Sequence, residues 1–256
     1  MQEFTKGRYR VRLAKDGDDL IAAQRLRFRA FRNGTTGREG RDADAFDARC
    51  RHVLVQSDTG DLLATCRLYV AAQSEALSTA YSAQFYDLDG LSALRGPYLE
   101  VGRFCLDAPA DQGSDALRLV WAALTRIVEA EGISVLFGCS SFPGNDPAQH
   151  ADALALLAAR HLGPERLRPV ARKGETVRLQ PADHDPKAAA VQMPPLLRTY
   201  LMMGGWVGGD AVIDRDLGTL HVFTAVEVAA IPPVRARLLR ADAACGALTA
   251  SRGPHT

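Results

Sequence analysis

The chain has 256 residues, of which 47% are hydrophobic, and its formal net charge is +1. That length and apolar content suffice for one domain with a sizeable core, and a nearly neutral chain has no overall attraction to nucleic acid. The segment 1–8 has no apolar signal-peptide core, and no stretch has the apolar length of a membrane span. We therefore expect a cytoplasmic protein, at most in peripheral contact with the inner membrane.

The first half of the chain alternates apolar runs with one helical pattern. Apolar spacing predicts a helix that is capped by Asp18. A turn at 58–60 separates two runs with strand composition and predicts a hairpin. The predicted strands cover 9–13, 52–56, 62–70 and 98–106.

The second half continues this alternation. An amphipathic pattern begins at Ser114 and stops at Gly132, which predicts a helix with a glycine at its end. The apolar run 133–141 is typical of a strand that is buried on both faces. The remaining predictions are a helix over 147–161, a hairpin over 168–179, a connector over 181–190, a helix over 195–203 and a strand over 219–228. Five cysteines without a C-x-x-C pair indicate reduced core residues.

The predicted strand 98–106 carries two charges, Glu100 and Arg103, that are costly to bury. On a regular strand their side chains would point to opposite faces. Gly102 lies between them, where a bulge could redirect one of the two. A carboxylate and a guanidinium in such a run either form a structural ion pair or belong to a functional site, and the residues alone leave both interpretations open.

Three carboxylates, Asp42, Asp44 and Asp47, lie within six residues and form an acid cluster. Such a cluster can be a solvated turn, or it can hold a cation such as a basic amino acid. It lacks the glycine and the final glutamate of a calcium loop, and no histidine or cysteine stands at a zinc-like spacing from it. We therefore predict no metal site.

The order of these segments resembles a known group of enzymes. Arg27 and Phe31 belong to the first predicted helix, the acid cluster follows, and Arg67 lies on a predicted strand. Then comes the motif Glu100-x-x-Arg103-Phe104. This series resembles the N-terminal half of the acyl-homoserine-lactone synthases, which are members of the GNAT acyltransferase superfamily.

Two further features point away from the lactone synthases toward a related family. The tryptophan that follows the first helix in lactone synthases is missing after Phe31. The segments 136–144, 194–201 and 204–220 resemble the L-ornithine Nα-acyltransferases, which make lyso-ornithine lipid and are often labelled hemolysin-like. The resemblance covers roughly residues 8–240.

The resemblance implies an α/β (α+β) fold of the GNAT acyltransferase type. In that fold helices flank a twisted mixed central sheet whose fourth and fifth strands splay apart, here 98–106 and 133–141. We expect a single domain over 1–256, with a core over 1–180. A C-terminal extension over 191–240 would complete the fold, and 241–256 would form a flexible tail.

The resemblance also implies roles for individual residues. Glu100 would act as general base on the acceptor amine, with Arg103 as the second catalytic residue. The residues expected to bind the acceptor substrate are Arg27, Phe31, Asp42, Asp44, Asp47 and Arg67. Those expected to bind the acyl chain or its phosphopantetheine arm are Gly102, Phe104, Ser140, Ser141 and Trp206.

The donor is predicted to be acyl-carrier protein and not coenzyme A. The segment 111–115 keeps one glycine and adds two acids where coenzyme-A enzymes have a glycine-rich pyrophosphate signature. Acids repel a diphosphate more than the single phosphodiester of a carrier protein. No bound cofactor is expected, because the acyl-phosphopantetheine group is a substrate. The arginines predicted to dock the acidic carrier protein are Arg118, Arg126, Arg25, Arg29 and Arg32.

These inferences combine into one functional hypothesis. The chain is predicted to move a (3-hydroxy)fatty acyl group from acyl-carrier protein to the α-amine of L-ornithine by direct attack on the thioester. One alternative is a lactone synthase that uses S-adenosylmethionine. Another is a non-catalytic module that binds an acyl carrier or a lipid. For the enzyme, the lipid product would bring about peripheral contact with the membrane.

Overall fold

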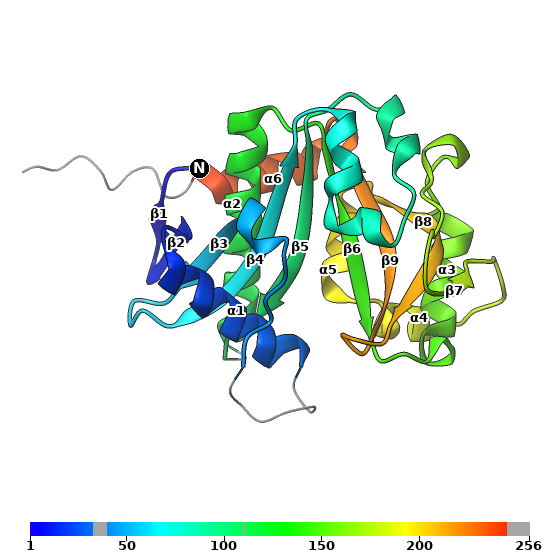
Figure 1. The fold of residues 1–256 in the computed structure, drawn as a ribbon, viewed down its shortest axis with the longest axis horizontal. Helices are drawn as coiled ribbons and strands as arrows, with labels where there is room; N and C mark the ends of the chain where they lie inside the picture. The colour runs from blue at the N-terminus through cyan, green and yellow to red at the C-terminus, as the bar shows by residue number, and fades with distance from the viewer. Residues whose placement is uncertain (33–39, 110, 245–256) are drawn as a thin grey trace, which may run out of the picture. The chain divides into compact units, whose positions relative to one another are not determined.

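The structure is a computed structural model that describes residues 1–32, 40–109 and 111–244 (Figure 1). Its internal contacts divide the chain into two compact units. Unit 1 comprises 1–68, 103–132 and the segment from 233 onward, and unit 2 comprises 69–102 and 133–232. Two strands, β4 (Leu62–Ala71) and β5 (Tyr98–Leu106), pass from one unit into the other.

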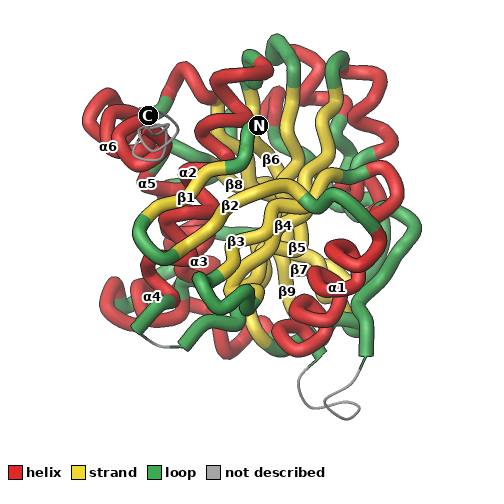
Figure 2. The backbone as a smooth tube through the Cα atoms, turned by 90° about the vertical axis from the view of Figure 1, so that its left-hand side faces the viewer, coloured by secondary structure: helices red, strands yellow, loops and turns green. Residues whose placement is uncertain are grey.

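Unit 1 is built on antiparallel strands. The strands β1 (Phe4–Lys6), β2 (Tyr9–Leu13), β3 (Arg51–Gln56) and β4 pair in that order. Helix α1 (Gly17–Phe31) lies on one side of these strands. Helices α2 (Gly113–Glu131) and α6 (Pro233–Ala244) pack together on the other (Figure 2). The short 3-10 helix η1 (Asp47–Arg49) precedes β3.

The helix ends in unit 1 show where local sequence signals succeed and fail. The N-cap of α1 is Asp16, whose side chain accepts a hydrogen bond from the N–H of Asp19, so the prediction of Asp18 was wrong. Ser114 was also wrongly predicted as a cap, because α2 begins one residue before it, without a side-chain cap. The predicted end of α2 is confirmed: Gly132 adopts φ 62°, the left-handed conformation that favours glycine at a helix end.

Unit 2 contains parallel and antiparallel pairs. The strand order is β5, β6 (Val135–Pro143), β9 (Thr219–Glu227), β8 (Trp206–Asp214) and β7 (Glu175–Arg178). The pair β5–β6 is parallel and the other pairs are antiparallel. With helices packed on a mixed sheet, the predicted fold class is confirmed.

Two apolar cores cover the two faces of the unit 2 strands. One core joins Phe137 and Phe223 to the segment with η2 (Ser74–Thr79), η3 (Tyr81–Gln84) and η4 (Asp89–Ala93). The other joins Phe142 and Val222 to the helices on the opposite face. Those helices and the remaining turns are η5 (Pro147–His150), α3 (Ala151–Arg160), η6 (Glu165–Leu167), α4 (Pro186–Gln192), α5 (Pro195–Met202) and η7 (Val228–Ala230).

The hairpin predicted over 168–179 was wrong. Strand β7 pairs with β8, which the sequence had not marked as a strand, and Ala171 makes an isolated bridge with Tyr86. Gly174, immediately before β7, has φ 99° and turns the chain into that strand. The pairing was missed because it joins segments about thirty residues apart, which no local pattern reports.

Strands β5 and β6 approach each other closely over a short length. Their parallel register runs from Tyr98↔Val135 to Glu100↔Phe137. At the next position, a Cβ added to Gly138 would lie 2.4 Å from the carbonyl oxygen of Val101, so only glycine fits there. Within the described residues, no helix is long and apolar enough to cross a bilayer.

Candidate active site

The acid cluster of unit 1 does not face solvent as a simple turn. Three arginines from three different elements converge on it: Arg27 from α1, Arg67 from β4 and Arg103 from β5. We call these six side chains the Arg–Asp cluster. The N–H of Asp42 donates to the carbonyl of Gln24 at 3.1 Å, which ties the acidic segment to α1.

Arg27 forms the buried centre of the Arg–Asp cluster. Its Nε donates to Asp42 Oδ2 at 3.0 Å, and its Nη1 and Nη2 donate to the two oxygens of Asp47 at 2.8 and 2.9 Å. Its Nη2 also donates to the carbonyl of Asp42. The side chains of all three residues are at most 5% exposed. A guanidinium this deep in the protein needs such a full set of acceptors.

Asp44 forms the rim of the same cluster. Its side chain is 25% exposed, and its two oxygens accept hydrogen bonds from Arg67 Nη1 at 2.5 Å and Arg103 Nη2 at 3.3 Å. Arg103 Nε also donates to Asp42 at 2.9 Å, and Arg32 lies 3.8 Å from Asp42. The six side chains of the cluster balance in charge, and Arg32 adds a fourth guanidinium group near Asp42.

Burial and hydrogen bonds affect the buried groups Asp47 and His52 differently. Burial opposes ionisation of Asp47, but hydrogen bonds from Arg27, Arg67 and Gln24 outweigh it and hold the pKa of this carboxyl well below its usual range. Burial lowers the pKa of His52, whose Nε2 lies 3.3 Å from the carbonyl oxygen of Asp47. Asp47 therefore favours its ionised form in the folded protein, and His52 favours its neutral form.

Arg103 owes its orientation to an unusual backbone. Its φ is 48°, in the left-handed region that non-glycine residues rarely adopt. We predicted that Gly102 would carry a bulge, but the left-handed residue is Arg103 itself. Because β5 is not regular here, the alternation of side chains breaks between Glu100 and Arg103.

Glu100 accepts hydrogen bonds from the segment that carries η3. Its Oε2 accepts a hydrogen bond from the N–H of Tyr81 at 2.8 Å, and its Oε1 accepts from the N–H and the hydroxyl of Ser82 at 2.7 and 2.6 Å. Glu100 is 4% exposed. The donors are the first N–H groups of η3, and each of them stabilises the ionised carboxylate.

The residues predicted for the acyl group occupy different surroundings. Ser140 is buried, and its Oγ accepts a hydrogen bond from Thr224 at 3.1 Å, whereas Ser141 is exposed. Trp206 packs in the unit 2 core against Gly163, where an added Cβ would lie 2.2 Å from the indole. Their role in acyl binding remains a prediction.

The other predicted residues are partly exposed. Phe104 lies 6.3 Å from Trp121, measured between ring centroids, and Phe31 ends α1. Gly102 has nothing within 4 Å of an added Cβ, so the backbone there leaves space for another group.

Each unit also carries an open pocket. The pocket of unit 1 has a volume of about 600 Å³ and is lined by Arg8, Arg25 and Arg29 together with three aspartates. Arg29 forms an ion pair with Asp107 at 2.6 Å. The pocket also includes Gln112, immediately before α2. This surface combines arginine side chains with the start of a long helix.

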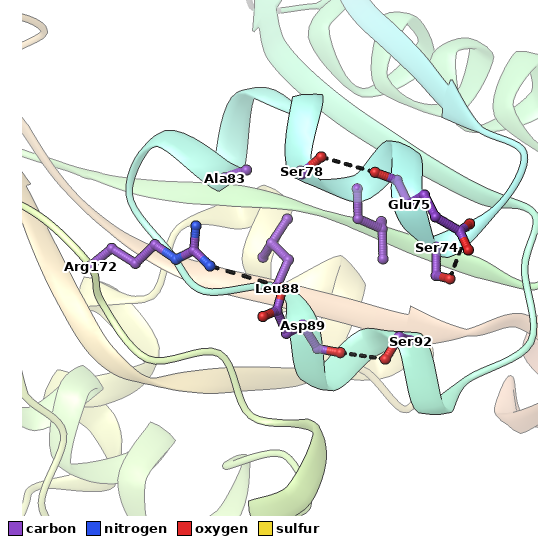
Figure 3. A pocket seen from close by; sticks show the side chains of 9 residues that line it. Ser74, Glu75, Ser78, Ala83, Leu88, Asp89, Ser92 and Arg172 are labelled. Atoms are coloured by element: carbon purple, nitrogen blue, oxygen red, sulfur yellow. Dashed lines mark hydrogen bonds and ion pairs between the residues drawn. The ribbon is translucent and has the colours of Figure 1, made fainter.

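The pocket of unit 2 has a volume of about 260 Å³ (Figure 3). Glu75 and Ser78 of η2 lie on one side and Asp89 on the other, with Arg172 reaching toward Asp89. The hydroxyl of Ser78 donates to the carbonyl of Glu75, and Arg172 also pairs with Asp87 at 3.2 Å. These polar groups satisfy one another, and we assign no ligand to this pocket.

The docking arginines predicted on α2 are engaged within unit 1. Arg118 pairs with Asp242 of α6 at 2.6 Å, and Arg126 donates to the carbonyl of Ala243 at 2.6 and 2.8 Å. The guanidinium of Arg126 also lies 3.8 Å from the ring centre of Phe4. Both residues therefore fasten α6 to α2, whereas Arg25 and Arg29 of α1 line the pocket of unit 1.

Comparison with known proteins gives the chain a family. The profile of the acetyltransferase (GNAT) domain matches residues 26–122. An L-ornithine Nα-acyltransferase of Rhodobacter capsulatus is 35% identical over 237 residues, covering 87% of this chain and 91% of that protein. A second, from Brucella abortus, is 35% identical over 236 residues, covering 85% and 83%. The chain belongs to the L-ornithine Nα-acyltransferase family.

Membership of this family makes the protein an acyltransferase, and the predicted enzyme class is confirmed. Two solved structures also resemble the chain. The N-acyl amino acid synthase FeeM from uncultured soil microbes is 12% identical with a TM-score of 0.48, covering 87% of this chain and 92% of that one. The CoA-dependent acyl-homoserine lactone synthase MesI is 14% identical with a TM-score of 0.47, covering 92% and 95%.

Several residues that contact the Arg–Asp cluster or Glu100 were not found from the sequence. Gln24 donates to Asp47 at 2.9 Å and lies three residues before Arg27, so the helical spacing could have revealed it. The ring of Phe46 lies 5.6 Å from the guanidinium of Arg67. Ser82 gave no signal, because its segment has neither helical nor strand periodicity.

Proposed function

We propose that this acyltransferase moves a (3-hydroxy)fatty acyl group from acyl-carrier protein to the α-amine of L-ornithine. The observation that carries the proposal is the whole-length similarity to proteins named for that acceptor. The buried and fully oriented carboxylate of Glu100 supports it. The product is lyso-ornithine lipid.

The reaction needs one proton removed before the attack. The α-ammonium gives a proton to Glu100, and the nitrogen lone pair then forms a bond with the thioester carbon. As the C–S bond breaks, the phosphopantetheine sulfur leaves with the electron pair and takes the second proton of the nitrogen. Amide, free thiol and one released proton balance the atoms, and no bound cofactor is consumed.

The Arg–Asp cluster is proposed to bind the acceptor. Each of its three carboxylates is already paired with a guanidinium group, so the cluster fits the carboxylate of an amino acid better than a dicationic side chain. Arg67 and Arg103 are therefore assigned to the carboxylate of the acceptor, with Asp44 orienting both. Arg27, Asp42 and Asp47 form the buried part of the cluster and hold it together.

The donor is proposed to be acyl-carrier protein. Arg8, Arg25 and Arg29 line the pocket that borders the start of α2, where helix N–H groups favour a phosphate. An acidic carrier would be attracted to exposed arginines, and this attraction weakens with salt. We expect the reaction in the cytoplasm, with peripheral membrane contact when the lipid product leaves.

One assay tests the proposal against its alternatives. The enzyme is incubated with 3-hydroxyacyl-carrier protein, all twenty standard amino acids, ornithine and S-adenosylmethionine, and the products are identified by mass spectrometry. Acylated ornithine is the expected product. An acyl-homoserine lactone would support the synthase alternative, and the absence of any acylated product would support the non-catalytic module.

The same assay tests the donor. Acyl-coenzyme A is expected to give a much lower kcat/KM than the carrier protein at every salt concentration. Arg25→Glu should lower kcat/KM for the carrier protein, whereas Arg215→Glu, an exposed ion-pair arginine outside the pocket, should not. Equal use of coenzyme A thioesters would remove the carrier protein from the proposal and leave the acyltransferase.

A further inference from the structure

Ser82 is a principal hydrogen-bond partner of Glu100. It supplies two of the three hydrogen bonds described above, one from its N–H and one from its hydroxyl, both to Oε1. Ser82 is 0% exposed, so water cannot replace its hydroxyl. The remaining donor, the N–H of Tyr81, binds the other carboxylate oxygen.

The hydroxyl of Ser82 has a second neighbour on the adjacent strand. Its Oγ lies 3.4 Å from the Sγ of Cys139, two residues beyond Phe137, the last residue of β6 that pairs with β5. An O–H···O⁻ bond to a carboxylate is stronger than a bond to sulfur. While Glu100 is ionised, the hydroxyl therefore donates to Glu100, and the thiol can donate to Ser82 Oγ.

We propose that Ser82 is a positioning residue that fixes Glu100 in one orientation and keeps it ionised until it accepts the proton of the acceptor amine. This inference rests on the proposed function, because it requires Glu100 to be the base. When the proton moves from nitrogen to a Glu100 oxygen, the carboxyl becomes neutral and its hydrogen bond with Ser82 weakens. Loss of the proton restores that bond.

A purely structural role for Ser82 predicts different behaviour. The hydroxyl would then only fasten η3 to β5 and β6, and its removal would lower stability without altering how turnover depends on pH. A residue that acts on the ionised carboxylate must also alter the pH dependence. Among the residues described above that bond to Glu100 or to Ser82, Tyr81 and Cys139 have titratable side chains, and Tyr86 follows further along the segment. Burial raises the pKa of Tyr86 well above its ordinary value.

The decisive variant is Ser82→Ala, which removes the hydroxyl and keeps both backbone donors. We expect kcat to fall about tenfold, and the acidic limb of the pH profile to move up by about one pH unit, the usual effect of losing a hydrogen bond to a charged group. The KM for the acyl donor should stay unchanged. Ser78→Ala is the matched control, because its hydroxyl donates to a backbone carbonyl in the neighbouring turn.

Three comparisons make the result decisive. Cys139→Ser should leave the acidic limb in place, which excludes the thiol as its origin. In a Glu100→Gln background, Ser82→Ala should cost no further activity, since its effect passes through Glu100. Should Ser82→Ala fail to fold, Ser82→Cys in the presence of a reductant keeps the shape with a weaker donor and should give a smaller shift in the same direction.

The failures can be told apart. If Glu100→Gln keeps full turnover, Glu100 is not the base, and both the proposed role of Glu100 and this inference fall. If Glu100→Gln is inactive while the serine variants show an unmoved acidic limb, only the inference about Ser82 is overturned.

Discussion

Arg27 and Asp47 form a two-pronged ion pair, in which two guanidinium nitrogens meet two carboxylate oxygens at 2.8 and 2.9 Å. Asp44, three residues earlier in the chain, is the exposed member of the same cluster. The same substitution should therefore have different effects at the two positions. At Asp47 it should lower stability, and at Asp44 it should weaken substrate binding.

Asp47→Asn is expected to destabilise the fold by about 3–5 kcal/mol, because it leaves a buried guanidinium short of a charged partner. Asp44→Asn should cost less, about 1 kcal/mol, since Asp44 is itself 25% exposed, and Arg67 keeps its bond to Asp47 and Arg103 its bond to Asp42. It should instead raise the KM for the amino acid acceptor by weakening the alignment of Arg67 and Arg103. Urea unfolding and steady-state kinetics on both variants check this. Equal loss of stability at the two positions would contradict it.

Acidification should destabilise the protein in two stages. The folded pKa of His52 lies below its ordinary value, so the unfolded chain takes up the proton first and stability falls as the pH drops through about 6.5. The folded pKa of Asp47 is also lowered, so its contribution is present above about pH 4 and is lost below it. Unfolding free energies measured from pH 8 to pH 3 should show both stages, and His52→Gln should make the first smaller, since burial also lowers the pKa of His161.

The left-handed backbone of Arg103 gives an unusual ranking of variants. Both Arg103→Ala and Arg103→Gly remove the same ion pairs, but only glycine adopts φ 48° without strain. We expect the glycine variant to be at least as stable as the alanine variant, against the usual order, in which glycine costs about 0.5–1 kcal/mol. Chemical denaturation of the two decides. An alanine variant clearly more stable than the glycine variant would rule out the strain.

The two glycines flanking the end of the β5–β6 pairing should differ sharply. Gly138→Ala would push its Cβ against the carbonyl of Val101 and should lower stability by about 1–3 kcal/mol. Gly102→Ala meets no atom within 4 Å, so it should fold normally. Thermal unfolding separates them. A loss of turnover in folded Gly102→Ala would place the acyl donor beside that residue.

Local sequence patterns predicted those strands and helices that have a clear apolar run or a characteristic residue at their ends. The bounds of β5 match the prediction because most residues of Tyr98–Leu106 are apolar or aromatic, and α2 stops at Gly132 as expected. The residues of the Arg–Asp cluster were predicted from the order of motifs in the family that the sequence resembles. Periodicity alone could not bring Arg27 and Arg67 together, since they lie forty residues apart.

What the sequence did not reveal depends on non-local contacts. Strand β8 escaped because a bulge at Gly208 and Gly209 interrupts its alternation between Val207 and Ala211. The segment that carries Ser82 consists of 3-10 turns, which have no amphipathic period. The left-handed conformation of Arg103 could not be predicted from the sequence, because a residue other than glycine rarely adopts it.

The two tryptophans of the chain lie one in each unit, Trp121 on α2 and Trp206 on β8. The indole N–H of Trp206 is buried, and no acceptor among the described residues reaches it, so Trp206→Phe sacrifices no hydrogen bond. The variant with a single tryptophan at 121 then reports fluorescence from unit 1 alone, and Trp121→Phe reports from unit 2. With these two variants, the unfolding of each unit can be followed separately by tryptophan fluorescence.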